Sequence, residues 1–250
     1  MNVQAVRTHR ITSADTDILA VIDQHVGEMP DGSVLAIASK VVAICEGRVV
    51  DKASASKDAL VEQEAELYLP RTASRFDVML TIKRSMVIPT AGIDESNADG
   101  VYVLWPADPQ RSANTIWRHV RERFGRARVG VVITDSRTSP LRRGVTGIAV
   151  SHCGFAALRS QLGVRDLYGR PLEMTQINVM DALAGAAVFV MGEAAEQTPL
   201  AVIDDLPHIA FTDREPTEEE VRGLRIDIED DLYGPLLSRV AWRRGGATPE

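Results

Sequence analysis

The sequence predicts an α/β protein of the mixed α+β kind. The run VGVVIT at residues 129–134 is apolar without a break, which is typical of a strand covered on both faces. Residues 109–124 repeat apolar side chains at helical spacing, begin at the cap pair Asp108 and Pro109, and end at Gly125. Helical and strand patterns are mixed along the 250 residues without internal repeats or a strict βαβ alternation.

The first hundred residues predict the following elements in order. Short apolar runs predict strands at residues 3–7, at 34–37 and within 41–50, with Ser39 and Lys40 at the junction of the last two. Capped amphipathic segments predict helices that begin at Ser13 and at Ser56, the second stopped by Pro70. Residues 76–88 predict a short helix and a strand, which lead into the polar loop 89–100.

The remaining elements follow the same two patterns. Beyond the segments at 109–124 and 129–134, apolar runs predict strands at residues 101–105, 145–151 and 200–203. Helices are expected near residues 155–162, at 178–192 and near 217–224. The strand at 129–134 is expected to end at Asp135 and Ser136, followed by a loop at 137–144.

The charge balance argues against two classes of partner. Lys and Arg number 28 against 35 Asp and Glu, for a formal charge of −7, so the chain has no overall positive field for nucleic acid or an anionic membrane. Of this charge, −6 lies between residues 215 and 231, which leaves −1 for the rest. Most of the net charge therefore belongs to a segment near the C-terminus, and the bulk of the protein is nearly neutral.

Cysteine usage and hydropathy predict a cytoplasmic protein. Cys45 and Cys153 are far apart and show no zinc-ligand or disulfide pattern. The N-terminal segment is too charged for a signal peptide, and the longest apolar run, 182–192, is well short of the roughly 20 residues that span a bilayer.

Three acidic segments stand where a strand or helix gives way to a loop. They contain Asp94 with Asn97, Asp135 with Ser136, and Glu193 with Glu196. Carboxylates held in this way could bind a hard divalent cation. Each also has an ordinary alternative, since the first pair could form a turn, Asp135 could cap one, and the two glutamates could form a solvated helix end.

Other polar residues leave similar alternatives open. Arg137, Arg142 and Arg143 would suit phosphate or carboxylate recognition, and equally an exposed loop. His152 is expected to be a hydrogen-bonded core histidine. Asp181 is expected either as a paired structural acid or as a residue that supports a neighbouring site.

In order along the chain, these segments resemble the coenzyme F-420-0:gamma-glutamyl ligase family. The matching stretches are SKVVAICEGRVV (39–50), AGIDESN (91–97), the helix after Asp108, VGVVITDS (129–136), RRGVTGIAV (142–150), DLYGRPLEMT (166–175), the helix with Asp181, and MGEAAEQTPLAVI (191–203). Any one motif alone is weak, whereas their shared order and spacing over about residues 1–205 is specific. The resemblance thus implies a domain over residues 1–205, and we expect residues 206–250 to be an acidic C-terminal extension packed on it.

The resemblance implies a gamma-glutamyl ligase fold and reaction. Members add L-glutamate to a deazaflavin coenzyme: GTP is consumed, the acceptor carboxylate is activated as an acyl phosphate, and the glutamate amine attacks it. The resemblance also implies a homodimer, two divalent ions that are Mg²⁺ or Mn²⁺, and potassium as a further candidate ion.

The family motifs also imply roles for individual residues. Asp94 and Asp135 correspond to catalytic metal ligands, Ser136 and Glu193 to ligands of a second ion, and Asn97 to a nucleotide or substrate contact. The implied nucleotide-binding shell consists of residues 9–12, Ser39, Lys40, Met191, Gly192, Ala194, Ala195, Glu196, Gln197 and Thr198.

Two positions depart from the family pattern. The family usually has a lysine where this chain has Ile44, and a Gly-Arg pair where it has Arg137-Thr138-Ser139-Pro140. Four alternatives follow: an acceptor other than the deazaflavin, such as a folate-like molecule; a non-catalytic nucleotide- or deazaflavin-binding homologue; a different donor on the same scaffold; or the family reaction itself.

Overall fold

A five-stranded sheet forms the centre of the protein, as described by a computed structural model for residues 1–248. In spatial order its strands are β1 (Asn2–Val6), β12 (Leu200–Asp204), β2 (Ser33–Ala38), β8 (Val129–Thr138) and β9 (Val145–Cys153). Only β2 and β8 pair in parallel, and the other neighbours pair antiparallel. The predicted mixed α/β fold is confirmed.

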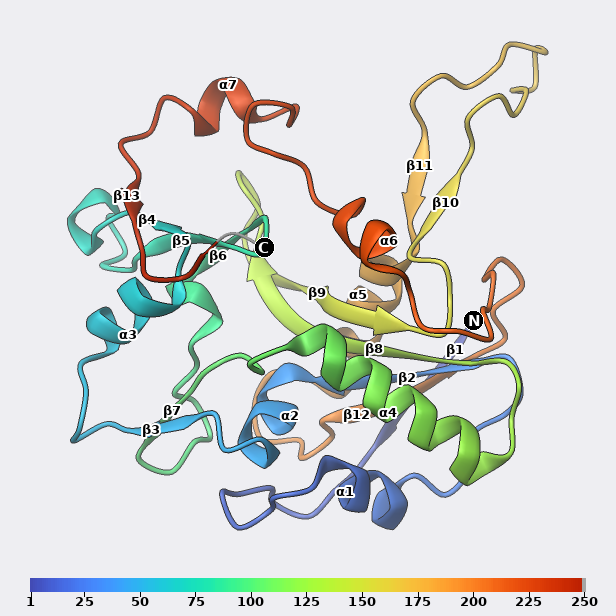
Figure 1. Ribbon diagram of the computed structural model, residues 1–250, viewed down its shortest axis with the longest axis horizontal. Coiled ribbons are helices and arrows are strands. Elements are labelled where there is room, and N and C mark those ends of the chain that lie inside the picture. The colour runs from blue at the N-terminus through green and yellow to red at the C-terminus, as the bar shows by residue number, and fades with distance from the viewer. Residues whose placement is uncertain (249–250) are drawn as a thin grey trace.

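Helices cover both faces of this sheet. On one face α1 (Ile18–His25), α2 (Ser39–Cys45) and α4 (Pro109–Phe124) pack on Leu35, Ile37 and Val131. On the other face α5 (Val179–Met191) packs on Val34, Ala36 and Val132. Figure 1 shows α4 in front of the sheet and α5 behind it. Successive residues of one strand point to opposite faces of the sheet. The continuous apolar runs of β2 and β8 therefore contribute buried side chains to the core on each face.

A smaller layer lies beside the central sheet. It contains β4 (Leu67–Tyr68), β5 (Leu80–Lys83) and β6 (Met86–Pro89), with α3 (Lys57–Glu64) and the short helices η1 (Arg71–Ala73) and η2 (Thr90–Gly92). A separate antiparallel pair joins β3 (Val49–Asp51) to β7 (Val101–Val103).

Two further segments extend from this body. An arm formed by β10 (Leu158–Ser160) and β11 (Gln176–Asn178) carries a loop that projects away from the rest of the chain (Figure 1). After residue 205 come α6 (Glu218–Arg222), α7 (Gly234–Leu237) and β13 (Arg243–Arg244), which pairs with β4. The division into a domain and an acidic extension stays a prediction.

Several expected elements are wrong in type. Residues 39–45 form a helix rather than a strand, because the segment is buried on nearly every side and its apolar run carries no usable period. Residues 158–160 form a strand rather than a helix, because they pair with residues 176–178, which the local sequence does not reveal. The region 76–88 contains a hairpin, whose turn residues Arg84 and Ser85 both have positive φ.

Other predictions are wrong only in their limits. The cap of α1 is Asp17, whose carboxylate accepts a hydrogen bond from the backbone of Leu19, while Ser13 lies in the preceding turn. The helix that begins at Ser56 ends at Glu64. Strand β8 runs on to Thr138 past an irregularity at residues 133 and 134, so Asp135 and Ser136 lie within it.

Candidate active site

A cavity of about 330 Å³ lies at the ends of strand β2 and helix α5, beside the middle of β8. The parallel strands β2 and β8 run toward the same edge of the sheet, where ligand sites of α/β proteins commonly form. Five segments far apart in sequence line the cavity, at residues 8–11, 38–44, 94–97, 134–136 and 188–199.

Nearly all the site residues expected from the sequence line this one cavity. They are Ser39, Lys40, Asp94, Asn97, Asp135, Ser136, Met191, Gly192, Glu193, Ala194, Ala195, Glu196, Gln197 and Thr198. Of the expected shell residues 9–12, the first three line the cavity and Thr12 does not. Ile44, where the family usually has lysine, also lines it, with an apolar side chain.

Three carboxylates enter the cavity from three separate elements. Asp94 follows η2, Asp135 lies in β8, and Glu193 follows the end of α5. The hydroxyl of Ser136 donates a 3.3 Å hydrogen bond to Glu193, which links the second and third segments. Folding thus brings together three acids for which the sequence alone left open a choice between metal ligand and ordinary structural residue.

Asp135 is held by two donors. Its Oδ1 accepts from the backbone N–H of Ser136 at 2.7 Å, and its Oδ2 accepts from the indole N–H of Trp105. Trp105 is buried and packs beside Gly92, where a Cβ atom would lie 2.2 Å from the indole nitrogen. Trp105 is not among the site residues expected from the sequence, because no local pattern indicates that the segment after β7 reaches β8.

The acids perturb one another electrostatically. The pKa of Asp135 is raised to about 6, chiefly by burial and further by the charges of Asp94 and Glu193, against the hydrogen bonds that it accepts. Burial and the charge of Asp94 also raise the pKa of Glu193. Such mutual repulsion between carboxylates is relieved when a cation binds among them.

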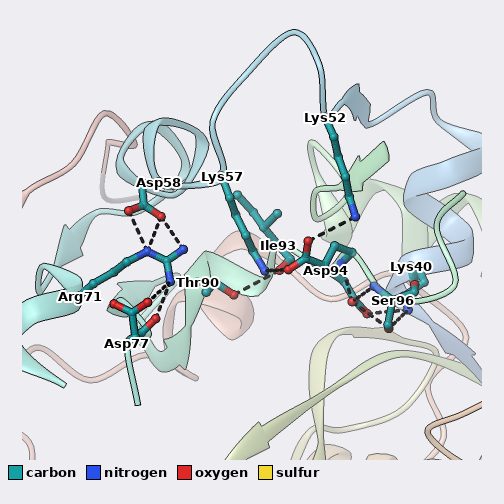
Figure 2. A network of polar contacts seen from close by, with 11 residues as sticks. Lys40, Lys52, Lys57, Asp58, Arg71, Asp77, Thr90, Ile93, Asp94 and Ser96 are labelled. Atoms are coloured by element: carbon teal, nitrogen blue, oxygen red, sulfur yellow. Dashed lines mark hydrogen bonds and ion pairs between the residues drawn. The ribbon is translucent and has the colours of Figure 1, made fainter. Parts of the chain in front are cut away.

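Asp94 has a different environment. Burial acts to raise its pKa, yet the net shift is downward because the Lys40 ammonium, 2.5 Å away, and hydrogen bonds from Ser96 stabilise the carboxylate. Lys40 also donates to the backbone carbonyl and hydroxyl of Ser96. Figure 2 shows this cluster, with Lys52 and Lys57 directed at the neighbouring segment, where both pair with Glu95.

The side-chain oxygens of these residues fit a divalent cation that takes part of its coordination shell from water or substrate rather than from the protein. Within residues 1–248, no three acidic, histidine or cysteine side chains are close enough in this conformation to enclose an ion by themselves. Mg²⁺ commonly takes one or two protein carboxylates and fills its remaining positions with water and phosphate oxygens. The pairs Asp94 with Asp135, and Ser136 with Glu193, are compatible with that mode.

The loop at residues 191–198 is fixed by bonds to its own backbone and to distant segments. Glu196 folds back over Gly192 and accepts a hydrogen bond from the backbone of Ala194 at 2.8 Å. Asn97 donates to the carbonyl of Ala194 at 2.7 Å, and the Gln197 carbonyl accepts from the backbone of Thr8 at 2.9 Å. The loop is therefore ordered by the same segments that carry Asp94 and the N-terminal shell.

The arginine loop expected to bind phosphate lies elsewhere. Arg142 and Arg143 are exposed in the β8–β9 connection, and Arg137 lines a second cavity. The strand β8 continues past residue 135 and carries these residues beyond the first cavity. His152 is buried in the core as expected, but the expected hydrogen bond is missing at its Nδ1, which has no partner among residues 1–248.

The part of the chain described by the structure has no helix that is both long and apolar enough to cross a membrane.

Comparisons with known proteins agree with the resemblance. Residues 5–205 match the family model described as F420-0:Gamma-glutamyl ligase. The chain is 38% identical to the coenzyme F420:L-glutamate ligase of Methanopyrus kandleri, over 76% of this chain and 81% of that relative. It is 33% and 34% identical to the proteins of the same name from Methanothermobacter thermautotrophicus and Archaeoglobus fulgidus. These alignments cover 76% of this chain and 81% and 82% of the respective relatives.

Proposed function

Because the chain belongs to the F420-0:gamma-glutamyl ligase family and is a ligase, we propose that it joins L-glutamate to a carboxylate of coenzyme F420-0 or a related acceptor. The bond formed is a gamma-glutamyl amide, and the reaction consumes GTP in the presence of Mg²⁺ or Mn²⁺. The convergence of Asp94, Asp135 and Glu193 on one cavity carries this proposal.

The proposed reaction has two bond-forming steps. In the first, the acceptor carboxylate attacks the γ-phosphorus of GTP, which gives an acyl phosphate and GDP. In the second, the glutamate amine attacks the acyl carbon, phosphate leaves, and the amine loses a proton. Phosphoryl transfer depends mainly on positioning and charge neutralisation, and bound divalent ions would supply much of that neutralisation.

The protein's own residues set the geometry. Trp105 and the Ser136 backbone orient the carboxylate of Asp135, and Lys40 holds that of Asp94. Asp94 and Asp135 would hold one ion, and Ser136 and Glu193 a second. The elevated pKa of Asp135 favours partial protonation of the metal-free protein near neutral pH, so ion binding would release protons.

The fixed loop at residues 191–198 supports a nucleotide-binding role. Its backbone is shaped by Gly192 at φ 81° and Gln197 at φ 58°, conformations that persist when surrounding contacts hold them. Ser39 and Lys40 line the same cavity from the start of α2. We propose that this shell binds the phosphates and ribose of GTP.

We also propose a homodimer in which the arm contributes to the interface. The loop between β10 and β11 exposes Leu167 fully, Tyr168 to 84% and Met174 to 89%. Apolar side chains gathered on a projecting segment are typical of an association surface.

The reaction is tested by phosphate release from GTP with coenzyme F420-0, L-glutamate and Mn²⁺. Release that requires both substrates, with a product heavier by one glutamyl residue in mass spectrometry, supports the proposal. Omitting either substrate, or adding a chelator, is the control. Phosphate release with a folate-like acceptor and none with coenzyme F420-0 would reassign the acceptor. If none of the carboxylate acceptors supports phosphate release, the ligase reaction is contradicted.

A further inference from the structure

A buried ionic cluster of three residues contacts Trp105 from outside the first cavity. Glu64, at the end of α3, accepts hydrogen bonds of 2.8 Å from Lys83 of β5 and from Arg48. Lys83 is only 8% exposed. Burial lowers the pKa of its ammonium, and the charge of Glu64 acts against that shift. None of the three residues lines the first cavity, and the proposed reaction uses none of them.

The two cations of this cluster hold Trp105 at both of its ends. Arg48 Nε donates a 3.0 Å hydrogen bond to the Trp105 carbonyl, and Lys83 Nζ lies over the indole ring, 5.3 Å from its centroid. Charged groups are costly to remove from water, and well-packed apolar side chains often replace a buried ion pair without loss of stability. The contacts with Trp105 therefore point to a role for these charges beyond stability.

Trp105 has little freedom to move. It is 1% exposed and packs with Ile88 of β6 and Ile148 of β9, while Gly92 leaves room for the indole nitrogen. Its N–H, the one polar group of the side chain, donates to Oδ2 of Asp135. The orientation of the indole therefore fixes the orientation of this carboxylate.

The charge of Lys83 also acts on the hydrogen bond itself. A cation over the face of an indole is attracted by the ring's π-electrons and polarises them, which makes the indole N–H a stronger donor. The acceptor is a carboxylate, so the bond is charge-assisted and directional. With Oδ1 of Asp135 held by the Ser136 backbone, both oxygens keep a lone pair for a cation.

We propose that Lys83 is a positioning residue of the ligase site, which acts through the Trp105 indole to hold the Asp135 carboxylate in the orientation that binds a divalent cation. This inference rests on the proposed function, because that function assigns the cation to Asp135. Groups that orient metal ligands commonly change metal affinity or activity by about 10- to 100-fold when they are removed.

The indole N–H signals in NMR spectra test the contact without turnover or metal. The chain has three tryptophans, and the indoles of Trp117 and Trp242 donate to backbone carbonyls elsewhere, so their signals are internal controls. In isotopically labelled, metal-free protein, Lys83→Met should move the Trp105 indole proton upfield, because the hydrogen bond weakens. The other two signals should stay in place, and Trp105→Phe assigns the signal by removing it.

A matched control breaks another ion pair in the same layer. Arg71 pairs with Asp58 and does not touch Trp105, so Arg71→Met should leave all three indole signals unchanged. If Lys83→Met does not fold, Lys83→Gln takes its place, because it removes the charge and keeps a hydrogen-bond donor for Glu64.

Titration calorimetry with Mn²⁺ measures the effect on the site. We expect Trp105→Phe to raise Kd for Mn²⁺ by about 10- to 100-fold and Lys83→Met to raise it by about 10-fold. Lys83→Arg should restore most of the affinity, since a guanidinium also stacks on an aromatic face. In active enzyme, kcat should fall in the same order, while KM for L-glutamate changes little. A purely structural role of Lys83 would lower Tm without weakening Mn²⁺ binding.

The outcomes separate this proposal from the ligase function. If wild type shows no ligation, the proposed function fails, yet a moved Trp105 signal together with weaker Mn²⁺ binding still supports the positioning role. An unmoved Trp105 signal in the variant that lacks the Lys83 charge, equal Mn²⁺ affinity of that variant and wild type, or no Mn²⁺ binding to wild type overturns it.

Discussion

Replacing Asp135 by asparagine is expected to stabilise the metal-free protein while removing its activity. Folding raises the pKa of this carboxyl from 3.8 to about 6. At about 1.36 kcal/mol for each pKa unit, the ionised carboxylate costs about 3 kcal/mol of folding free energy above pH 6. Asparagine has one acceptor oxygen, so it loses the bond from Trp105 or from Ser136, worth about 1 kcal/mol. The net gain is about 2 kcal/mol.

The pH dependence follows from the direction of that shift. Between pH 4 and pH 6 the folded protein binds more protons at Asp135 than the unfolded chain does, so wild-type stability falls as the pH rises. Asparagine does not titrate. The advantage of Asp135→Asn should therefore be near its maximum at pH 7 and should shrink as the pH falls from about 6 to about 4.

Thermal unfolding at pH 7 and pH 4 tests this, with Asp230→Asn, an exposed acid that does not line the cavity, as the control. For a chain of this length, 2 kcal/mol corresponds to a Tm increase of about 4 to 8 °C. Mn²⁺ should raise the Tm of wild type but not of Asp135→Asn, and kcat of the variant should fall by about 100-fold or more. A variant that melts at or below the wild-type Tm at pH 7, or that retains turnover, would refute the reasoning.

Three further predictions concern the same cavity and the arm. Gly192→Ala should raise KM for GTP at least several-fold, because φ is 81° and the new Cβ would lie 2.5 Å from the Glu196 carboxyl carbon; an unchanged KM would show that the loop shape is irrelevant to nucleotide binding. Lys40→Gln should move the acid limb of the kcat/KM profile to higher pH, because it removes the ammonium that lowers the pKa of Asp94, and a profile that stays in place would contradict this role. Leu167→Asp combined with Tyr168→Asp should convert the proposed dimer to a monomer in sedimentation velocity, whereas Arg239→Ala, in the segment after α7, should not; a dimer that persists would exclude this loop from the interface.

The core elements could be predicted because their signals are local. The buried strand at 129–134, the helix from Pro109 to Phe124 and the helix from Val179 to Met191 each combine a clear period or apolar run with a cap. Segments 39–45 and 158–160 could not be predicted in the same way. The first is apolar on nearly every side. The second depends on a partner strand, and the paired residues lie from 20 positions apart, at Leu158 and Asn178, to 16 apart, at Ser160 and Gln176.

The site shows the same distinction between local and distant information. The motifs suggested Asp94, Asp135 and Glu193, since oxygen ligands at element ends are a recognisable pattern. Only the folded chain shows that all three face one cavity, that Trp105 holds Asp135, and that Lys40 neutralises Asp94. These relations join residues 30 to 99 positions apart, and sequence spacing does not report them.

By itself the sequence determined the fold class, the family resemblance and most of the residues that line the first cavity, because these depend on composition, periodicity and short motifs. The tertiary structure decided which acid is stabilised as a carboxylate and which has a raised pKa, since that depends on burial and on charges brought close by folding. It also placed Arg137 in a different cavity from Asp135, because β8 continues past the predicted strand end.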